Sequence, residues 1–287
     1  GAYGASSTYL NYLYLGDGDD TPFSGGATQI TSDTDFSSRM EVVDVNQDGA
    51  LDLVVGNGFW LSSGTSNVKI YFNDKSGNPF DTATGRVLGD DTVSTTGIAV
   101  GDTDNDGKLD LVTVGSKARP VRLYELDGNT TIEQIPYQEI SPDSVDSQAV
   151  AVADFDGDGD QDVFVSTSGV NRLYYNIAAS QAFNTVADLP IDTSSYSTVP
   201  VNVGDFNNDG FTDVIAGVWG GVNKLNINNG TRIAFNQAAI NIGTDSLNTQ
   251  ALAVGDINKD GRLDIVGGNN GANNLLYINN GSANPFT

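Results

Sequence analysis

Acidic side chains recur along the chain in a nine-residue pattern that could hold a metal ion through oxygen atoms. The pattern reads Asp-x-Asp/Asn-x-Asp-Gly-x-x-Asp and starts at residues 44, 102, 154, 205 and 256. Its first, third, fifth and ninth residues offer carboxylate or amide oxygens, which a hard divalent cation prefers, and the glycine at the sixth position permits a sharp turn. The seventh residue varies freely in type, as expected where only its backbone carbonyl is a ligand. The five copies therefore predict about five Ca²⁺ sites.

The predicted calcium ligands form five groups, one for each copy of the pattern. They are Asp44, Asn46, Asp48, Ala50 and Asp52; Asp102, Asp104, Asp106, Lys108 and Asp110; Asp154, Asp156, Asp158, Asp160 and Asp162; Asp205, Asn207, Asp209, Phe211 and Asp213; and Asp256, Asn258, Asp260, Arg262 and Asp264. An EF-hand would also carry a bidentate Glu at position twelve, and no copy has one. The alternative explanation is an acidic Asp-Gly hairpin turn that binds no metal.

The residues around each loop predict short β-strands, which we call A to D in chain order. In the third copy, 149–153 precedes the loop, and 162–166, 172–176 and a segment near 183–189 follow it. These segments are rich in apolar, β-branched and aromatic residues and show no helical period. Four short strands that return about every 51 residues predict an all-β fold, a β-propeller of four-stranded blades, with a calcium loop between strands A and B.

The repeats divide a single propeller domain, residues 1–287, into one partial blade and five further units. The expected bounds are 1–35, 36–93, 94–145, 146–196, 197–247 and 248–287. The first segment carries only strands of the C and D kind, and the last unit ends before a strand D. We therefore expect about six blades with the first incomplete. An N-terminal strand that completes the C-terminal blade would cover the exposed sheet edges.

The composition excludes several classes of function. There are 37 acidic and 13 basic residues, and the resulting net charge of −24 opposes binding to the phosphate backbone of nucleic acid. The chain has no Cys and no His, which excludes disulfides, thiol chemistry and a His general base. No segment approaches the roughly 20 apolar residues of a membrane span, so membrane insertion is not expected. Weak calcium sites fill where calcium is plentiful, which favours an extracellular or cell-surface location.

The repeated sequence also resembles a known family. Gly-Asp-x-Asn/Asp-x-Asp-Gly-x-x-Asp-Leu-Val-x-Gly, best matched by residues 100–115 and 254–267, resembles the FG-GAP or VCBS repeat of bacterial secreted proteins and integrin α-subunit propellers. The resemblance implies a calcium-clamped propeller. It does not imply one function, because such propellers occur in adhesins, lectins, receptors and polysaccharide lyases.

Aromatic residues in glycine-rich segments are the candidate binding residues. Phe59, Trp60 and Trp219 fall between the expected strands B and C of two units. An aromatic face there would suit a sugar ring or the side chains of a protein partner, although the same residues could pack between blades. We therefore expect a non-catalytic binding or adhesion module whose partner is a glycan or an extracellular protein.

Two other functions fit parts of the sequence. A structural subunit of an extracellular fibre or surface assembly would use the unmatched termini to exchange strands and self-assemble. A polysaccharide lyase would use a Tyr as base and an Arg or Lys to neutralise a uronic carboxylate. The available residues, Tyr124, Tyr174, Tyr175 and Arg172, occupy repeated strand C positions, which is typical of scaffold. We therefore expect no enzymatic activity.

Overall fold

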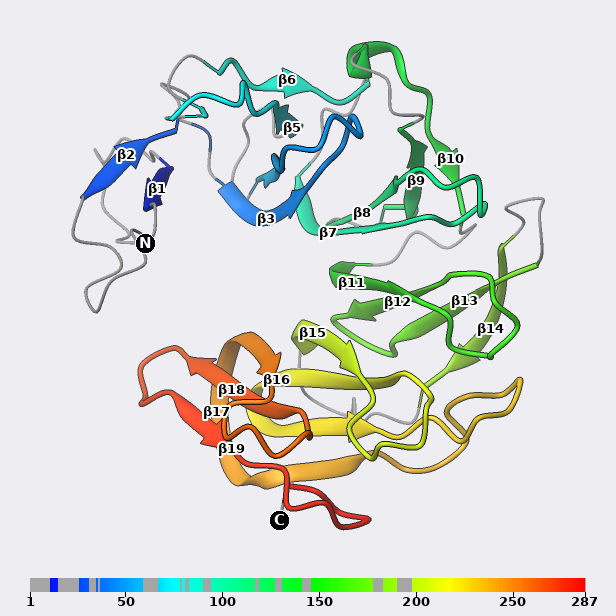
Figure 1. Cartoon of the computed structure of the whole chain (residues 1–287). Helices are drawn as coiled ribbons and strands as arrows, with labels where there is room; N and C mark the ends of the chain where they lie inside the picture. The colour runs from blue at the N-terminus through cyan, green and yellow to red at the C-terminus, as the bar shows by residue number, and fades with distance from the viewer. Residues whose placement is uncertain are drawn as a thin grey trace. The chain divides into compact units, whose positions relative to one another are not determined.

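The computed structural model consists of antiparallel β-sheets (Figure 1). It describes residues 11–14, 26–30, 35, 37–58, 67–77, 79–80, 83–89, 94–116, 119–126, 131–140, 146–177, 183–189 and 198–286. The chain divides into two compact units, residues 1–96 with 124–137, and residues 97–123 with 138–287. Among the described residues there is no helix of the length and hydropathy that a membrane span requires.

The first unit contains a small hairpin and a four-stranded sheet. In the hairpin, β1 (Tyr12–Tyr14) pairs with β2 (Ala27–Gln29). The sheet has the order β3-β4-β5-β6, with bounds Ser37–Val43, Asp52–Asn57, Val68–Tyr71 and Arg86–Val87. Every residue of β4 is buried, and its Leu53 and Val55 pack with Ile30 in the core of this unit. Two paired strands are therefore seen in the described part of residues 1–35, and their assignment as strands C and D of an incomplete blade stays a prediction.

The next sheet has the order β10-β9-β8-β7, with bounds Gln138–Glu139, Arg122–Glu125, Asp110–Gly115 and Thr95–Gly101. Between β9 and β10 the chain forms one 3-10 turn, η1 (Ile132–Gln134), although the sequence predicts no helical element there. Burial explains the turn, since the side chain of Ile132 is fully buried and its carbonyl accepts the N–H of Gly89 at 2.9 Å.

The second unit contains the repeat that the sequence predicts most clearly. Its sheet has the order β11-β12-β13-β14, with bounds Ser147–Ala153, Asp162–Thr167, Arg172–Asn176 and Phe183–Asp188. These bounds agree with the four expected strands, and Figure 1 shows them side by side. The inner strand β12 is buried at every residue, because Val163 and Val165 face one core cluster while Phe164 faces another. A strand buried on both faces explains the continuous apolar run in the sequence.

The last sheet differs from expectation because it joins two repeats. Its order is β15-β16-β17-β18-β19, with bounds Thr198–Gly204, Asp213–Asn226, Ile240–Gly255, Asp264–Asn269 and Leu275–Tyr277. The sequence predicts separate strands B and C at the start and end of β16, with a loop between them. Instead the backbone between them joins the ladder, since Trp219 pairs with Asn248, and Gly221 pairs with Leu247. The expected boundary at residues 247/248 falls inside β17.

In the second unit, the first strand of a repeat packs closely against the following repeat. A Cβ added at Gly97 of β7 would lie 2.9 Å from the Cα of Ala149 and 2.8 Å from Cγ2 of Val114. Similarly, a Cβ at Gly204 of β15 would lie 2.6 Å from Cδ1 of Leu263. The small residues that the sequence places in strand A therefore stand where neighbouring repeats approach each other.

Replacing Gly97 with Ala should test this close approach. The methyl group meets backbone atoms that cannot move aside, so we expect the free energy of unfolding to fall by about 1–3 kcal/mol. Thermal or urea unfolding measures the change. Gly255→Ala is the matched control, because Gly255 likewise lies in a first strand that precedes an acidic loop and nothing lies within 4 Å of its added Cβ. Equal stability of the two variants would contradict the packing described here.

Candidate metal centres

The five acidic loops occupy equivalent places in the fold. Each joins the first two paired strands of its repeat: β3 to β4, β7 to β8, β11 to β12, β15 to β16 and β17 to β18. The ninth residue of each pattern is the first residue of the second strand. The sequence prediction that the loop connects strands A and B is therefore confirmed in all five copies.

The loop backbone bends twice into the left-handed region. The sixth-position glycines have φ between 83° and 96° in all five loops. The fourth position is also left-handed, although its residues are mostly not glycine, with φ of 55° at Gln47, 59° at Asn105 and 62° at Lys259. Two such bends close together turn successive N–H groups toward the side-chain oxygens of the same loop. The sequence pattern did not indicate the second bend.

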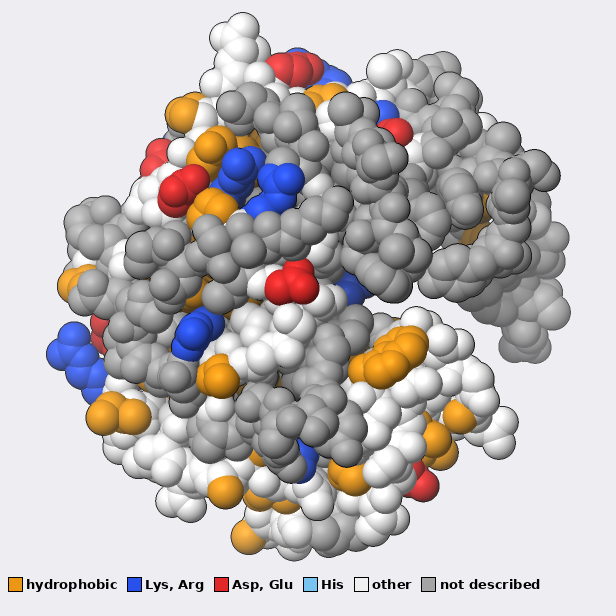
Figure 2. All heavy atoms as spheres, turned by 180° about the vertical axis from the view of Figure 1, so that it is seen from behind, with side chains coloured by type: hydrophobic (Ala, Val, Ile, Leu, Met, Phe, Trp, Pro, Cys, Tyr) orange, Lys and Arg blue, Asp and Glu red, His pale blue; other side chains and the backbone are white. Residues whose placement is uncertain are grey.

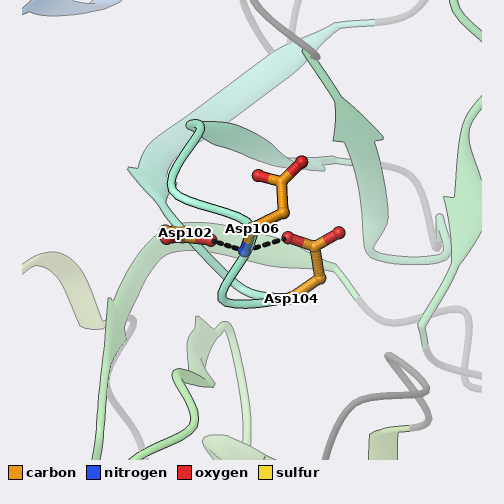
Figure 3. Close-up of side chains that lie close together, drawn as sticks. All are labelled: Asp102, Asp104 and Asp106. Carbon is orange, nitrogen blue, oxygen red and sulfur yellow. Dashed lines mark hydrogen bonds between the residues drawn. The ribbon is translucent and has the colours of Figure 1, made fainter.

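The first and third residues of the loop converge on one backbone N–H (Figure 3). The N–H of Asp106 donates to Oδ1 of Asp102 and to Oδ1 of Asp104, both at 3.1 Å. The N–H of Gly107 donates to the other oxygen of Asp102 at 2.9 Å. The loops that begin at residues 44, 205 and 256 repeat all three bonds. Backbone donors thus bring two or more ligand oxygens to one side of each loop.

Two loops each contain a triad of carboxylates whose oxygens lie close enough together to bind one ion. Asp102, Asp104 and Asp106 form the first, and Asp154, Asp156 and Asp162 the second, with one oxygen from each within 4.8 Å of the others. Oxygens bound to one calcium at 2.3–2.6 Å lie at most about 5 Å apart, so both triads fit. In the other three loops Asn46, Asn207 or Asn258 stands at the third position and supplies an amide oxygen instead.

The buried carboxylate of the ninth residue holds each loop in place by accepting backbone N–H groups. Oδ2 of Asp162 accepts the N–H of Phe155 at 2.9 Å, and Oδ1 accepts the N–H of Asn176 at 2.8 Å. The same pair of bonds, from the second loop residue and from an Asn after the third strand, holds Asp52 (Val45 and Asn73), Asp213 (Phe206 and Asn228) and Asp264 (Ile257 and Asn279). These asparagines were not identified from the sequence. Their recurrence 14 or 15 residues after the Asp, at 176, 228 and 279, is the signal that could have revealed them.

Cationic side chains accompany three of the loops. Lys108 Nζ lies 3.0 Å from Oδ2 of Asp106, Arg262 Nη2 lies 2.5 Å from Oδ2 of Asp260, and Lys75 Nζ lies 3.4 Å from Oδ1 of Asp48. The seventh-position side chains therefore contact the fifth-position carboxylate in two loops, which the sequence analysis did not predict. Such exposed pairs contribute little to stability, because water and salt screen them.

Burial makes the anchoring carboxylates harder to ionise. Burial, together with the charges of Asp156 and Asp158, raises the pKa of Asp162 to about 7, although the two backbone N–H bonds oppose the shift. Burial likewise raises the pKa of Asp213 to about 7, again with two opposing N–H bonds. In the absence of a cation, these carboxylates therefore favour the protonated form.

Of the aromatic candidates, the structure places only Trp219. It lies in β16, beside Gly220 with φ of 73°, and its side chain is 38% exposed. Phe59 and Trp60 lie outside the described residues. On the face in Figure 2, the described hydrophobic side chains are scattered among uncharged polar ones, with isolated acidic and basic groups between them.

The raised pKa values predict a pH dependence of the metal-free protein. Because the folded state keeps protons on Asp162 and Asp213 to a higher pH than the unfolded chain does, its free energy of unfolding falls as pH rises from about 4 to about 7. The melting temperature of desalted protein should therefore be higher at pH 5.5 than at pH 7.5. A change of ~1 kcal/mol corresponds to about 2–4 °C in a chain of this size.

Two variants separate this effect from the general charge of the molecule. Asp213→Asn should flatten the dependence on pH, because a neutral amide no longer titrates. Asp245→Asn removes an exposed carboxylate outside the loops and should leave the slope as in the wild type. A melting temperature that rises with pH in the metal-free wild type would contradict the assignment.

Sequence comparison identifies a repeat family in this chain. A model described as an FG-GAP-like repeat matches residues 102–165, 154–216 and 205–267, which together make up more than half of the chain. Each match begins at the first Asp of one acidic loop and ends in the second strand of the following repeat. No curated protein sequence matches the chain.

Solved structures resemble the chain at low sequence identity, and one of them has a TM-score above 0.5. A lectin from Agrocybe aegerita, described as recognising non-reducing terminal N-acetylglucosamine, is 19% identical, with a TM-score of 0.64 over 95% of this chain and 72% of that one. The Vibrio cholerae biofilm matrix protein Bap1 is 17% identical, with a TM-score of 0.44 over 82% of this chain and 35% of that one. The exotype rhamnogalacturonan lyase YesX is 15% identical, with a TM-score of 0.49 over 82% and 45%. This chain spans less than half the length of the latter two.

Proposed function

Because the chain belongs to the FG-GAP-like repeat family, we propose that it is a calcium-stabilised β-propeller that serves outside the cell as a non-catalytic binding module. The observation that carries this proposal is the same oxygen-lined loop at the same place in five repeats. The four-stranded sheets, and a fold shared with the lectin over 95% of the chain, support a propeller of about six blades with the first incomplete.

The donor atoms of the loops fit calcium. They are carboxylate, amide and carbonyl oxygens, and no softer ligand is available, since the chain has neither Cys nor His. The proposed ligands are the first, third, fifth and ninth residues of each loop, together with the backbone carbonyl of the seventh. A bound divalent ion supplies positive charge among three or four carboxylates. Without it, their repulsion opposes the approach of the first two strands.

We assign the partner to the class of glycans or glycan-bearing proteins. Trp219 is 38% exposed, and Gly220 beside it is exposed and adds no side chain. An aromatic face next to polar groups is suited to the apolar side of a sugar ring. The likeness to a lectin supports the architecture, while the partner is proposed from Trp219. Calcium at extracellular concentrations would keep weak sites filled, which supports an extracellular location.

Burial of the candidate catalytic tyrosines supports the non-catalytic role. A lyase would need an accessible Tyr as its base, yet Tyr124 and Tyr174 have no exposed surface and Tyr175 is 6% exposed. Tyr174 pairs with Val163 in the same register in which Tyr71 pairs with Leu53, so both occupy a repeated core position. We therefore assign these tyrosines to packing.

Removing one ligand should remove one calcium site. Asp106→Ala takes away a carboxylate of the first triad, so we expect about four bound ions per chain in place of about five. Each filled site at a hundredfold excess over its dissociation constant adds about 2.7 kcal/mol to the free energy of unfolding. Native mass spectrometry counts the ions, and thermal unfolding with calcium and with chelator measures the stabilisation. With Asp245→Ala as the control, an unchanged count in Asp106→Ala would refute the ligand assignment.

Trp219→Ala should abolish binding to glycans that the wild type recognises. Trp219 is 38% exposed and otherwise covered, so the variant should also melt below the wild type, and binding is compared at a temperature at which both proteins are folded. A glycan array on the calcium-loaded protein identifies the sugars, and titration measures the loss. Ile233→Ala, at a residue 58% exposed, is the control. Undiminished binding by Trp219→Ala would place the glycan site elsewhere on the molecule.

A further inference from the structure

Three buried asparagines join the four acidic loops of the second unit, each linking one loop to the loop before it. Nδ2 of Asn176 donates to the carbonyl of Thr103 at 2.7 Å, Nδ2 of Asn228 to that of Phe155 at 2.8 Å, and Nδ2 of Asn279 to that of Phe206 at 2.8 Å. The two partners are 73 residues apart in every case. All three acceptors are the second residue of an acidic loop, so the contact is a regular feature of consecutive repeats.

These bonds form one continuous row with the anchoring carboxylates. The N–H of Asn176 donates to Asp162, which also accepts the N–H of Phe155, and the carbonyl of Phe155 in turn accepts from Asn228. The row begins at Asp110, which accepts the N–H of Thr103, and ends at Asp264, which accepts the N–H of Ile257. Four loops, beginning at residues 102, 154, 205 and 256, are thus joined by three asparagines.

The asparagine side chain is suited to this position by its size and its donors. Besides the bond to the preceding loop, Nδ2 of Asn228 donates to the carbonyl of Thr212 in its own loop at 3.0 Å, and Oδ1 accepts the N–H of Gly230 at 3.0 Å. Nδ2 of Asn279 makes the matching bond to Leu263 at 3.1 Å. One side chain therefore fixes two successive loops at once, and an apolar side chain of similar size can make none of these bonds.

One repeat of this chain carries a leucine at the position equivalent to these asparagines. The asparagine stands two residues after a central residue of the third strand, as Asn176 follows Tyr174 and Asn228 follows Asn226. In the repeat that contains Tyr124, the residue at this register is Leu126, which is fully buried. Leucine is therefore compatible with the local packing of a repeat.

We propose that Asn176, Asn228 and Asn279 are positioning residues that couple the metal loops of consecutive repeats, so that the four loops bind calcium with positive cooperativity. This inference rests on the proposed function. An ion that fixes one loop orders its second residue and its ninth-position carboxylate. Because the asparagine is hydrogen-bonded to the neighbouring loop, that loop becomes more ordered as well. It then loses less conformational freedom when it binds its own ion.

The central asparagine gives the sharpest test. Asn228→Leu cuts the row into two pairs of loops, so the upper limit of the Hill coefficient for these sites falls from about four to about two. Native mass spectrometry during a calcium titration should show half-loaded chains accumulating in the variant and not in the wild type. The loop at residues 44–52 lies outside the row and adds the same independent ion to every variant.

Two further kinds of variant complete the experiment. Asn226→Leu is the matched control, since Asn226 is a buried asparagine at the end of β16, two residues before Asn228, and its side-chain amide has no hydrogen-bond partner within the described chain. It should leave the distribution of bound ions unchanged. Asn176→Leu and Asn279→Leu each separate one loop from the other three. In each variant, we expect the separated loop to bind its ion independently of the other three. They also test the proposal if Asn228→Leu does not fold.

The outcomes distinguish the two proposals. A wild type that binds no calcium at millimolar concentration overturns the proposed function, and the coupling with it. Calcium binding with the same ion distribution in the wild type and in the three asparagine variants overturns the coupling alone. Half-loaded chains in Asn228→Leu, absent from Asn226→Leu, support the coupling, because lower stability by itself would not divide the sites into pairs.

Discussion

A buried carboxylate that accepts two backbone N–H groups is the interaction on which the repeats depend. At Asp162 and Asp213 one oxygen holds the start of the acidic loop, and the other holds the chain as it leaves the third strand. A buried acceptor costs free energy unless it is hydrogen-bonded, and here both oxygens are. Three strands of a sheet are thus tied to one side chain, which places the remaining loop oxygens at the sheet's end.

The same arrangement creates the chemistry that we assign to the protein. Bringing three or four carboxylates together in each loop opposes folding, and burial raises the pKa of the anchoring Asp162 and Asp213. A divalent cation relieves the repulsion without altering the hydrogen bonds that hold the loop. In the function that we propose, the metal and the fold therefore stabilise each other. The uniform loop geometry would make this a property of the whole repeat array.

Aromatic packing supports the coupling between repeats. The rings of Phe155 and Phe235 meet edge to face with centroids 5.7 Å apart, and those of Phe206 and Phe286 meet in the same way at 5.9 Å. The backbone carbonyls of Phe155 and Phe206 also accept a hydrogen bond from an asparagine side chain of the next repeat. The second loop residue is thus fixed by its N–H, its carbonyl and its side chain, which gives a mechanical connection between the core and the acidic loops.

The sequence by itself determined the repeats, the four strands around residues 149–189, the antiparallel all-β class and the loop at each strand A to B connection. These features follow from local chemistry: β-branched runs form strands, and an Asp-Gly turn with spaced carboxylates closes them. Only the tertiary structure decided that β16 runs through Trp219, because the backbone there pairs with residues almost 30 positions later. It alone also revealed the role of Asn176, Asn228 and Asn279. Their recurrence after each Asp is visible in the sequence, but their carbonyl partners lie 73 residues away, and only the folded chain brings the two together.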